Sequence, residues 1–418
     1  MTPQTLLYIY IAILVISYLF NLWLGRLNHK SASLPVPERL ANVYDSEKYR
    51  KQQNYDSENY RFGLLSGFLS FVAILAMLVF GGFGLVDKLS ASLTNNTLLH
   101  SILFFAILAL ASDILGLPFQ IYHTFVIEEK FGFNKTTVKT FILDKLKGWL
   151  LGAVIGGGLL ALIIYLYEAT GQWFWVLAWL VITVFSLLLN YFYSTVILPL
   201  FNKLTPLEPG ELYNSLMNYA KKVDFSLKNV YVINGSKRST RANAYFSGFG
   251  KKKKVVLYDT LISQHSVEEL TAVLAHEIGH YKLKHLIKGI IVSVIYSGFM
   301  MFLLSVFLKF ESPSLALGAV KSSFHTAVLA FGLLYSPVSE MIGIIMNHFS
   351  RKHEYEADEF AATTFAAEPL ADGLMKLSAE NLSNLTPHPL YVFINYSHPT
   401  LFQRVTALDK IAASKHQA

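Results

Sequence analysis

The chain has 418 residues, of which 53% are hydrophobic and only 15% are charged. Because an average soluble domain has about 25% charged residues, this composition excludes an ordinary water-soluble protein, and it also excludes intrinsic disorder. Cysteine is absent, which excludes disulfide frameworks, thiol nucleophiles and cysteine-ligated zinc and leaves His, Asp and Glu as possible metal ligands.

Seven segments are long and apolar enough to cross a bilayer, which takes about 20 apolar residues. They cover residues 5–25, 63–86, 98–126, 146–167, 172–200, 287–310 and 323–348. The first is expected to be a retained span, because no basic residue precedes it and no cleavage site is apparent. Four ionisable residues within or near the spans are expected to face protein or water rather than lipid: Asp113, His123, His325 and Glu340.

The net charge of +7 is concentrated in alternate loops. The segment 26–62 holds seven Lys and Arg residues, the next loop holds only Lys88, and residues 127–145 hold four. Since positive loops stay on the cytoplasmic side, we predict an external N-terminus and a cytoplasmic C-terminus. The predicted segments are spans one to five in 1–200, a cytoplasmic protease segment in 201–286, spans six and seven in 287–348, and a cytoplasmic segment in 349–418.

The basic run Lys251–Lys254 is interpreted as a contact with anionic lipid headgroups. No aromatic residues are interleaved with it, so membrane lipids are expected as partners and nucleic acid is not. Residues 229–233, 242–246 and 254–258 have strand-like patterns, separated by turn signals at 234–235 and 248–250. A helix follows, because Ser266 and Glu269 form a capping-box pattern ahead of an apolar stripe.

A zinc-protease motif lies on this helix, as His276-Glu277-Ile278-Gly279-His280. Residues four apart face the same side of a helix, so the imidazoles of His276 and His280 can reach one ion. Glu277 lies one step around the helix, where it can serve as a general base without binding the metal. The H-E-x-x-H arrangement is typical of zinc proteases, and the alternative is a solvated helix with two incidental histidines.

The candidates for a third ligand lie just after the seventh span, in His353–Asp358. Glu354 and Asp358 are four residues apart on one helical face, while Glu356 points about 200° away. We predict Glu354 as the ligand and Asp358 as the residue that orients a ligand imidazole, and Glu356 stays open as the rival ligand. His285 has the wrong offset for the extended motif and is interpreted as a surface histidine. Three ligands leave one zinc position open, which is the catalytic form.

A second polar cluster lies downstream, in Ser397–Arg404. An oxyanion that develops during peptide hydrolysis needs extra hydrogen-bond donors, and His398 and Arg404 are candidates. A helix start and an ion pair would account for the same residues, and their spacing does not separate the two interpretations.

With these residues in hand, the sequence resembles the type I CAAX prenyl endopeptidases, which are integral-membrane zinc proteases of the gluzincin type. The resemblance runs along nearly the whole chain. The segments that carry it are Phe131–Thr137, Leu200–Leu207, Asn243–Gly250, His276–His280, the pair Glu354 and Asp358, and Ser397–Arg404.

The resemblance implies a mainly α-helical fold, in which seven transmembrane helices enclose a chamber and a gluzincin-like α+β domain with a small β-sheet holds one Zn²⁺ per chain. It implies that Asn243, Ala244 and Tyr245 form an edge strand that binds the substrate main chain. His398 and Arg404 would contact the substrate or the transition state. Such proteases remove the C-terminal tripeptide from prenylated proteins, so a peptide or prenylated protein is the expected substrate, and no obligate protein partner is inferred.

Three alternatives remain open at this point. A quality-control protease acting on misfolded or hydrophobic membrane peptides would use the same chemistry. A metal-binding transporter would be expected to place its ligands at the bilayer midplane, and a catalytically dead scaffold would not need the complete set of base and ligands. The C-terminal residues Lys415–Ala418 lack a dilysine retrieval signal, so we expect a bacterial inner-membrane protein with its zinc site on the cytoplasmic side.

Overall fold

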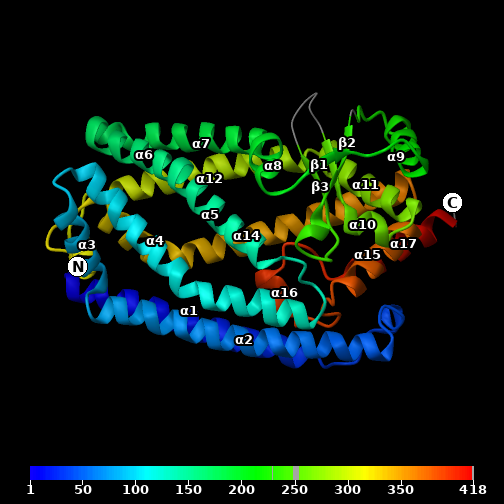
Figure 1. Ribbon diagram of the computed structural model, residues 1–418, viewed down its shortest axis with the longest axis horizontal. Coiled ribbons are helices and arrows are strands. Elements are labelled where there is room, and N and C mark those ends of the chain that lie inside the picture. The colour runs from blue at the N-terminus through cyan, green and yellow to red at the C-terminus, as the bar shows by residue number, and fades with distance from the viewer. Residues whose placement is uncertain (228, 248–253, 417–418) are drawn as a thin grey trace.

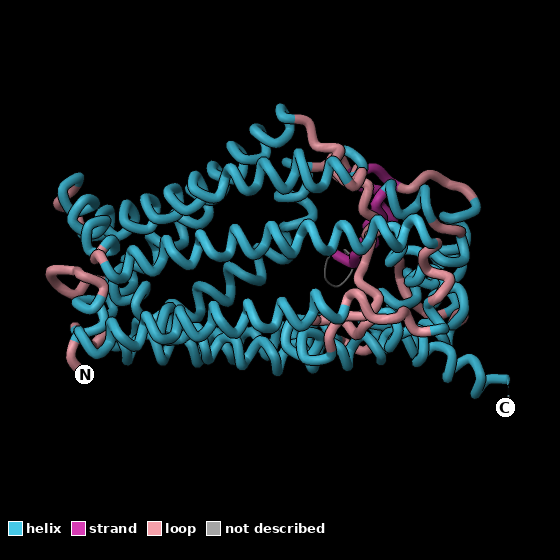
Figure 2. Tube along the Cα trace, turned by 90° about the horizontal axis from the view of Figure 1, so that it is seen from below, coloured by secondary structure: helices cyan, strands magenta, loops and turns pink. Residues whose placement is uncertain are grey.

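The computed structural model describes residues 1–227, 229–247 and 254–416. Long helices run along the longest axis of the molecule, and the small sheet gathers with several shorter helices at one end (Figures 1 and 2). The prediction of a mainly helical membrane protein with a small α+β part is confirmed. The predicted turn at 248–250 and residues Lys251–Lys253 of the basic run lie outside the described residues.

Eight apolar helices hold nearly half of the residues. They are α1 Pro3–Ser31, α2 Ser46–Val79, α4 Thr97–Tyr122, α5 Val138–Leu151, α6 Gly157–Thr170, α7 Phe174–Phe192, α12 His285–Phe307 and α14 Phe324–Thr364. Shorter helical segments connect or extend them, namely η1 Glu38–Leu40, α3 Gly82–Leu93, η2 His123–Glu128, η3 Gly152–Gly156, η4 Gly171–Trp173, η5 Tyr193–Ile197, α8 Leu198–Phe201 and α13 Ser312–Ala316.

Six helical segments of the described chain are long and apolar enough to cross a membrane. The longest, Val138–Phe201, has 64 residues, and as one continuous helix it would be about 96 Å long, roughly three times the hydrocarbon thickness. The chain instead reverses at Gly171, whose φ of 53° is available to glycine without steric cost, and α6 packs against α7. This segment therefore makes two passages, and the total of seven agrees with the sequence prediction.

Two predicted span ends do not coincide with the ends of the helices that contain them. Helix α2 ends at Val79 rather than at residue 86, because Gly81 adopts a left-handed conformation with φ of 65° and α3 begins directly after it. At the other end of the chain, α14 continues without a break to Thr364. The predicted boundary at residue 348 lies inside this helix, so Glu354 and Asp358 are carried by the same continuous helix as the seventh span.

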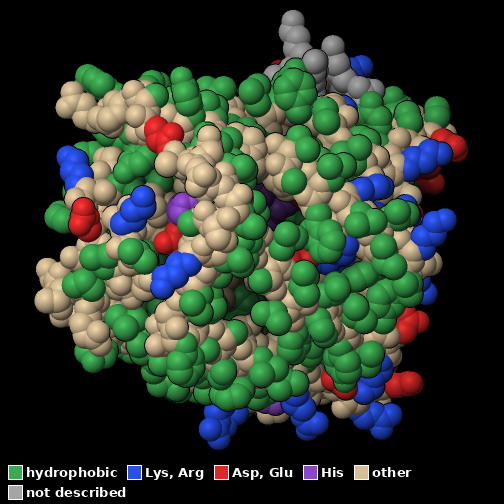
Figure 3. Space-filling model, turned by 60° about the vertical axis from the view of Figure 1, so that its left-hand side comes forward, with side chains coloured by type: hydrophobic (Ala, Val, Ile, Leu, Met, Phe, Trp, Pro, Cys, Tyr) green, Lys and Arg blue, Asp and Glu red, His purple; other side chains and the backbone are tan. Residues whose placement is uncertain are grey.

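The spanning helices are loosely packed against one another. In the most apolar window of each, only 6–17% of the residues are buried inside the chain. A helix in a solid bundle buries a broad apolar stripe against its neighbours, so the low burial leaves side chains accessible on more than one side. Figure 3 shows a recess between side chains in one face of the molecule. Both observations fit a ring of helices around a hollow interior.

A four-stranded sheet stands at the end of the molecule that also contains several shorter helices (Figure 1). Its strands are β1 Leu204–Pro206, β2 Asn229–Ile233, β3 Ala244–Ser247 and β4 Lys254–Tyr258, in the order β1-β2-β4-β3. Strands β2 and β4 are parallel, and β1 and β3 pair antiparallel at the two edges. The predicted strands 229–233 and 254–258 are confirmed, whereas the predicted strand 242–246 begins two residues later.

Helices around the sheet build the largest hydrophobic core. They are α9 Glu211–Lys222, α10 Asp259–Gln264, α11 Val267–Lys282, α15 Ala367–Glu380 and α17 Leu401–His416, whereas α16 Pro389–Asn395 packs against α14 and α1. Helix α11 begins as predicted, because the Glu269 amide donates to Ser266 Oγ at 3.1 Å and the Ser266 amide donates to a Glu269 carboxylate oxygen at 2.9 Å. Its apolar residues Leu270, Leu274 and Ile278 are fully buried in this core.

At the opposite end of the molecule, a buried polar cluster ties α3, α4 and α14 together. Asp87 Oδ1 lies 2.8 Å from His325 Nε2 and 3.0 Å from His100 Nε2. His325 is 1% exposed, and its Nδ1 contacts Ser101 Oγ at 2.9 Å. His325 therefore faces protein, as predicted for an ionisable residue within a span, and it connects three helices that are distant in sequence.

We expect Asp87→Ala to destabilise the protein by about 3 kcal/mol, because it removes the carboxylate that pairs with the buried His325 imidazole and with His100. The thermal unfolding midpoint in detergent measures the effect. The matched control is Asp56→Ala, which breaks a more exposed pair with His29 at 3.1 Å, with side chains 23% and 33% exposed, and is expected to cost less than about 1 kcal/mol. Equal shifts for the two variants would contradict a stabilising role of the buried cluster.

Candidate active site

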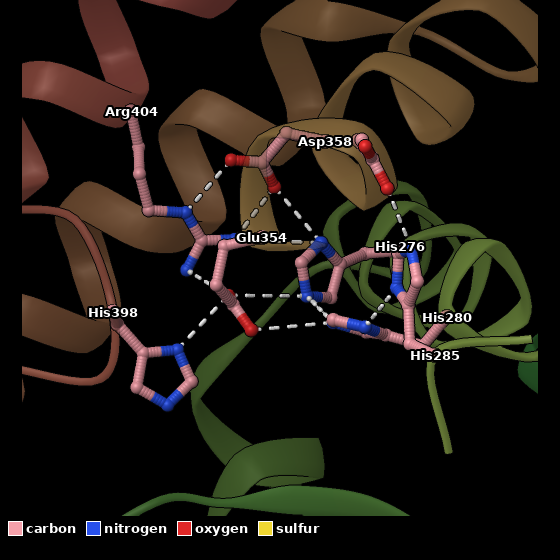
Figure 4. Close-up of polar contacts among 8 residues, drawn as sticks. His276, His280, His285, Glu354, Asp358, His398 and Arg404 are labelled. Atoms are coloured by element: carbon pink, nitrogen blue, oxygen red, sulfur yellow. Dashed lines mark hydrogen bonds and ion pairs between the residues drawn. The ribbon is translucent and has the colours of Figure 1, made fainter. Parts of the chain in front are cut away.

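The site lies between α11 and α14, which approach each other very closely at Gly279. A Cβ atom on Gly279 would lie 3.1 Å from Ala357 Cα and 3.2 Å from both the Ala357 carbonyl oxygen and Phe360 Cβ. The glycine in the zinc-protease motif thus lets one helix backbone lie against the other. This contact places Glu354, one turn before Ala357 on α14, opposite His276 and His280 (Figure 4).

Donor atoms of three residues converge in this gap. His276 Nε2 lies 3.1 Å from His280 Nε2 and 3.6 Å from Glu354 Oε2, and His280 Nε2 lies 3.3 Å from Glu354 Oε1. Zinc bonds to His and carboxylate ligands are about 2.0–2.2 Å long, so tetrahedral geometry requires donors roughly 3.3–3.6 Å apart. The structure thus brings the three predicted ligands together, with both histidine–carboxylate distances inside this range and the 3.1 Å between the two imidazole nitrogens just below it.

Glu354 Oε2 has neighbours that can carry a positive charge, His398 Nδ1 at 2.9 Å and Arg404 Nη1 at 3.4 Å, but neither forms an aligned hydrogen bond to it. The Glu354 side chain is 5% exposed, and among the described residues its Oε2 is one of few buried side-chain atoms that accept no well-aligned hydrogen bond. An ionised carboxylate has about four acceptor sites, and leaving one unused in a buried place is costly. A cation between Glu354 and the two imidazoles would satisfy it.

Asp358 and Arg404 stand behind the first imidazole. Asp358 Oδ1 lies 2.8 Å from His276 Nδ1, so that an Nδ1–H donated to the carboxylate leaves the lone pair of Nε2 facing the gap. Arg404 donates to both oxygens of Asp358, at 2.6 and 2.8 Å, and its Nη1 lies 3.4 Å from Glu354 Oε2. The Arg404 side chain is 11% exposed, and its polar contacts are with these two carboxylates and with His276 Nδ1, which lies 3.4 Å from its Nη2.

His398 approaches from the open side. It lies in the loop before α17, its side chain is 63% exposed, and its Nδ1 is 2.9 Å from Glu354 Oε2 (Figure 4). An exposed imidazole at this place can meet a bound molecule as well as the carboxylate. His398 therefore approaches the ligand cluster from the solvent-exposed side, and Arg404 approaches it from the buried side.

Glu277 faces a cavity of about 760 Å³. The cavity is bordered by His280 and by both apolar and polar residues of α7, α12 and α14, and apolar atoms make up most of its surface. Burial raises the pKa of the Glu277 carboxyl above its ordinary value, while the His276 and His280 imidazoles oppose that rise. A carboxyl with a raised pKa beside an apolar cavity is suited to accept a proton and release it again.

Strand β3 forms the edge of the sheet next to the motif helix, and it contacts α11. Asn243 is exposed, and its carbonyl accepts a hydrogen bond from the Tyr258 amide at 3.1 Å. The Tyr245 ring packs on the sheet against Val256 and neighbouring apolar residues. At this edge, the main chain of Asn243, Ala244 and Tyr245 is therefore available to pair with an added strand, whereas the Tyr245 ring is packed on the sheet.

The interpretation of His285 as a surface histidine is wrong. Its side chain is 5% exposed, its Nδ1 lies 2.9 Å from His280 Nδ1, and its Nε2 lies 2.9 Å from Glu356 Oε2. Glu356, the rival third ligand, thus points to His285 and away from the gap between His276 and Glu354. In the sequence, His285 follows His280 closely, but whether the two side chains meet depends on the conformation of the turn after α11.

We expect Gly279→Ala to weaken zinc binding and to lower the free energy of unfolding by about 1–3 kcal/mol, because the added methyl group meets backbone atoms that cannot move aside. Zinc titration and thermal unfolding measure the two effects. The control is Gly332→Ala on α14, where a Cβ would meet nothing within 4 Å. Normal zinc affinity in Gly279→Ala would show that this close approach does not position Glu354.

Comparisons with known proteins agree along the whole length of the chain. Residues 26–203 match the CAAX prenyl protease N-terminal domain, described as five membrane helices, and residues 206–412 match peptidase family M48. The chain is 34% identical to a CAAX prenyl protease 1 homolog of Arabidopsis thaliana, covering 96% of each chain. It is 33% identical to CAAX prenyl protease 1 of Saccharomyces cerevisiae, covering 92% of this chain and 91% of that one.

A solved structure is similar in fold as well. The crystal structure of S. mikatae Ste24p superposes with a TM-score of 0.91 at 32% sequence identity, and the match covers 97% of this chain and 99% of that chain. Likeness of this extent includes both the ring of helices and the α+β part that holds the His276, His280 and Glu354 cluster.

Proposed function

The chain belongs to the CAAX prenyl protease 1 family of M48 peptidases, and from this premise we propose that it cleaves prenylated peptides or proteins near their C-terminus with one zinc ion. The family match and the membrane-spanning helices together describe a membrane-embedded metalloendopeptidase of the CAAX protease type. The observation that carries the zinc assignment is the convergence of His276, His280 and Glu354, with donor atoms 3.1 to 3.6 Å apart.

The roles of the residues follow from their positions. When bound, zinc acts as a Lewis acid on the scissile carbonyl and lowers the pKa of a water molecule. Glu277 takes a proton from the attacking water and delivers it to the leaving amine. Asp358 holds His276 in the correct tautomer, and Arg404 fixes Asp358 by two hydrogen bonds.

Two further elements would hold the substrate. His398 is exposed on the open side of the site and is placed to donate to the oxygen that becomes charged during hydrolysis. The main chain of Asn243, Ala244 and Tyr245 lies at a sheet edge, where an extended peptide can add as a further strand. The apolar cavity beside Glu277 suits hydrophobic side chains next to the scissile bond.

We propose that this site faces the cytoplasm and that the membrane is a bacterial inner membrane. The alternation of Lys- and Arg-rich loops with loops that hold few of them supports the cytoplasmic orientation of the site. We therefore propose that the chain passes between membrane spans and cytoplasmic segments at residues 200, 286 and 348. Protease protection of residues 201–286 in inside-out against right-side-out vesicles tests the orientation, and fractionation of the source cells tests the location.

The activity is tested with purified, zinc-loaded protein and a farnesylated C-a-a-X peptide, beside the same peptide without the prenyl group. Release of the C-terminal tripeptide from the prenylated peptide alone supports the proposal. Equal cleavage of both peptides would instead assign the enzyme to general proteolysis of hydrophobic membrane peptides. Zinc binding without cleavage of either peptide would overturn the substrate assignment.

A further inference from the structure

The turn between α11 and α12 brings a third histidine against the zinc-protease motif. His285 follows His280 by five residues, and on an uninterrupted helix it would lie about 140° away around the axis. The helix ends at Lys282, however, and Lys284 adopts a left-handed conformation with φ of 59° and ψ of 30°. A left-handed lysine is uncommon, and this one reverses the chain so that His285 Nδ1 comes to 2.9 Å from His280 Nδ1.

The hydrogen bonds of this group have only one consistent direction. Glu356 Oε2 lies 2.9 Å from His285 Nε2, and an ionised carboxylate only accepts, so the proton is on His285 Nε2. A neutral imidazole then has a lone pair on Nδ1, which accepts from His280 Nδ1–H. His280 is left with its lone pair on Nε2, the atom that faces Glu354 and His276 (Figure 4).

Packing holds His285 in this orientation. Its side chain is 5% exposed, and its ring stacks on His353 with centroids 4.0 Å apart and planes 11° from parallel. On the far side, Lys352 Nζ lies 3.8 Å from Glu356 Oε1. A buried ring clamped between a stacking partner and a carboxylate has little freedom to rotate.

We propose that His285 and Glu356 form a positioning relay that fixes the tautomer and orientation of the ligand His280. The inference rests on the proposed function, in which His280 binds zinc. It gives each imidazole ligand its own carboxylate: Asp358 contacts His276 directly, and Glu356 acts on His280 through His285. Removal of such an orienting group typically lowers metal affinity by about 10- to 100-fold.

The test is zinc affinity of the purified full-length protein, measured by competition with a chromophoric chelator. We expect His285→Leu to raise the zinc dissociation constant about tenfold or more, and Glu356→Gln to raise it about three- to tenfold. His285→Asn, whose amide oxygen can take the place of Nδ1, is expected to recover most of the loss. His353→Phe keeps the stacking ring and changes no polar partner of His280, so it is the control and should bind as the parent does.

The readouts separate this inference from the proposed function. Asp358→Asn is the positive control, because it removes the charge that holds the other imidazole. If the zinc dissociation constant of His285→Leu were within twofold of the parent value while that of Asp358→Asn was clearly higher, the relay would be refuted. The assignment of the zinc ligands would be unaffected. If the parent bound no stoichiometric zinc, the proposed function itself would fail. Thermal unfolding identifies a variant that has lost its fold, and the milder His285→Asn and Glu356→Gln then decide.

Discussion

Replacing Glu277 by glutamine is expected to lower peptide cleavage by about 10³-fold or more, because the substitution removes the group that accepts the proton of the attacking water. Zinc content should stay at the parent level, since the three converging donors belong to His276, His280 and Glu354. Glutamine has nearly the same shape as glutamate, so a loss of activity with normal zinc binding points to proton transfer. The cleavage rate and the zinc content per chain are measured on the same preparation.

The control for this experiment is a carboxylate on the same helix. Glu268 lies in the first turn of α11 and is exposed, so Glu268→Gln is expected to leave both cleavage and zinc binding unchanged. Residual activity above about a tenth of the parent rate in Glu277→Gln would be far more than loss of a general base allows. The base would then be another group.

Local patterns were sufficient to predict much of the site. The capping box of Ser266 and Glu269 marks the start of α11, and helical periodicity places His276 and His280 on one face. The same reasoning puts Glu354 and Asp358 on one face of α14. These predictions succeed because each depends on residues within one or two turns of a helix, where the backbone geometry is fixed.

Other features depend on contacts or conformations that local patterns do not contain. His285 reaches His280 only because Lys284 takes a left-handed conformation, which the sequence of a lysine does not signal. The pairing of Asp87 with His325 and that of Arg404 with Asp358 join elements distant in the chain. These contacts arise from the packing of whole helices, so they become visible only with the fold.

The length of α14 has a similar explanation. Charged residues after residue 348 indicate where the apolar span leaves the membrane, but charge does not end a helix, and α14 continues through Ser350 and Arg351 to Thr364. One continuous helix, with Pro337 in its membrane-spanning half, thereby connects the wall of the helical ring with the metal site.

The two glutamates of α14 that compete for the role of third ligand are separated by matched substitutions. We expect Glu354→Gln to weaken zinc binding by more than about 100-fold, because it removes an anionic ligand and with it the carboxylate beside His398 and Arg404. Glu356→Gln should have an effect of about tenfold or less, since Glu356 contacts His285 and not the gap. Zinc titration of both variants measures the difference.

Activity at increasing zinc concentration extends the comparison. Because the defect of Glu354→Gln is in affinity, added zinc should restore part of its cleavage, whereas the same addition should not help Glu277→Gln, which lacks the proton acceptor. The opposite order, with Glu356→Gln losing zinc more severely than Glu354→Gln, would make Glu356 the ligand. That result would require α14 to rotate by about 160°, since the two side chains are separated by roughly 200° around the helix, and the Gly279 contact with Ala357 would have to break.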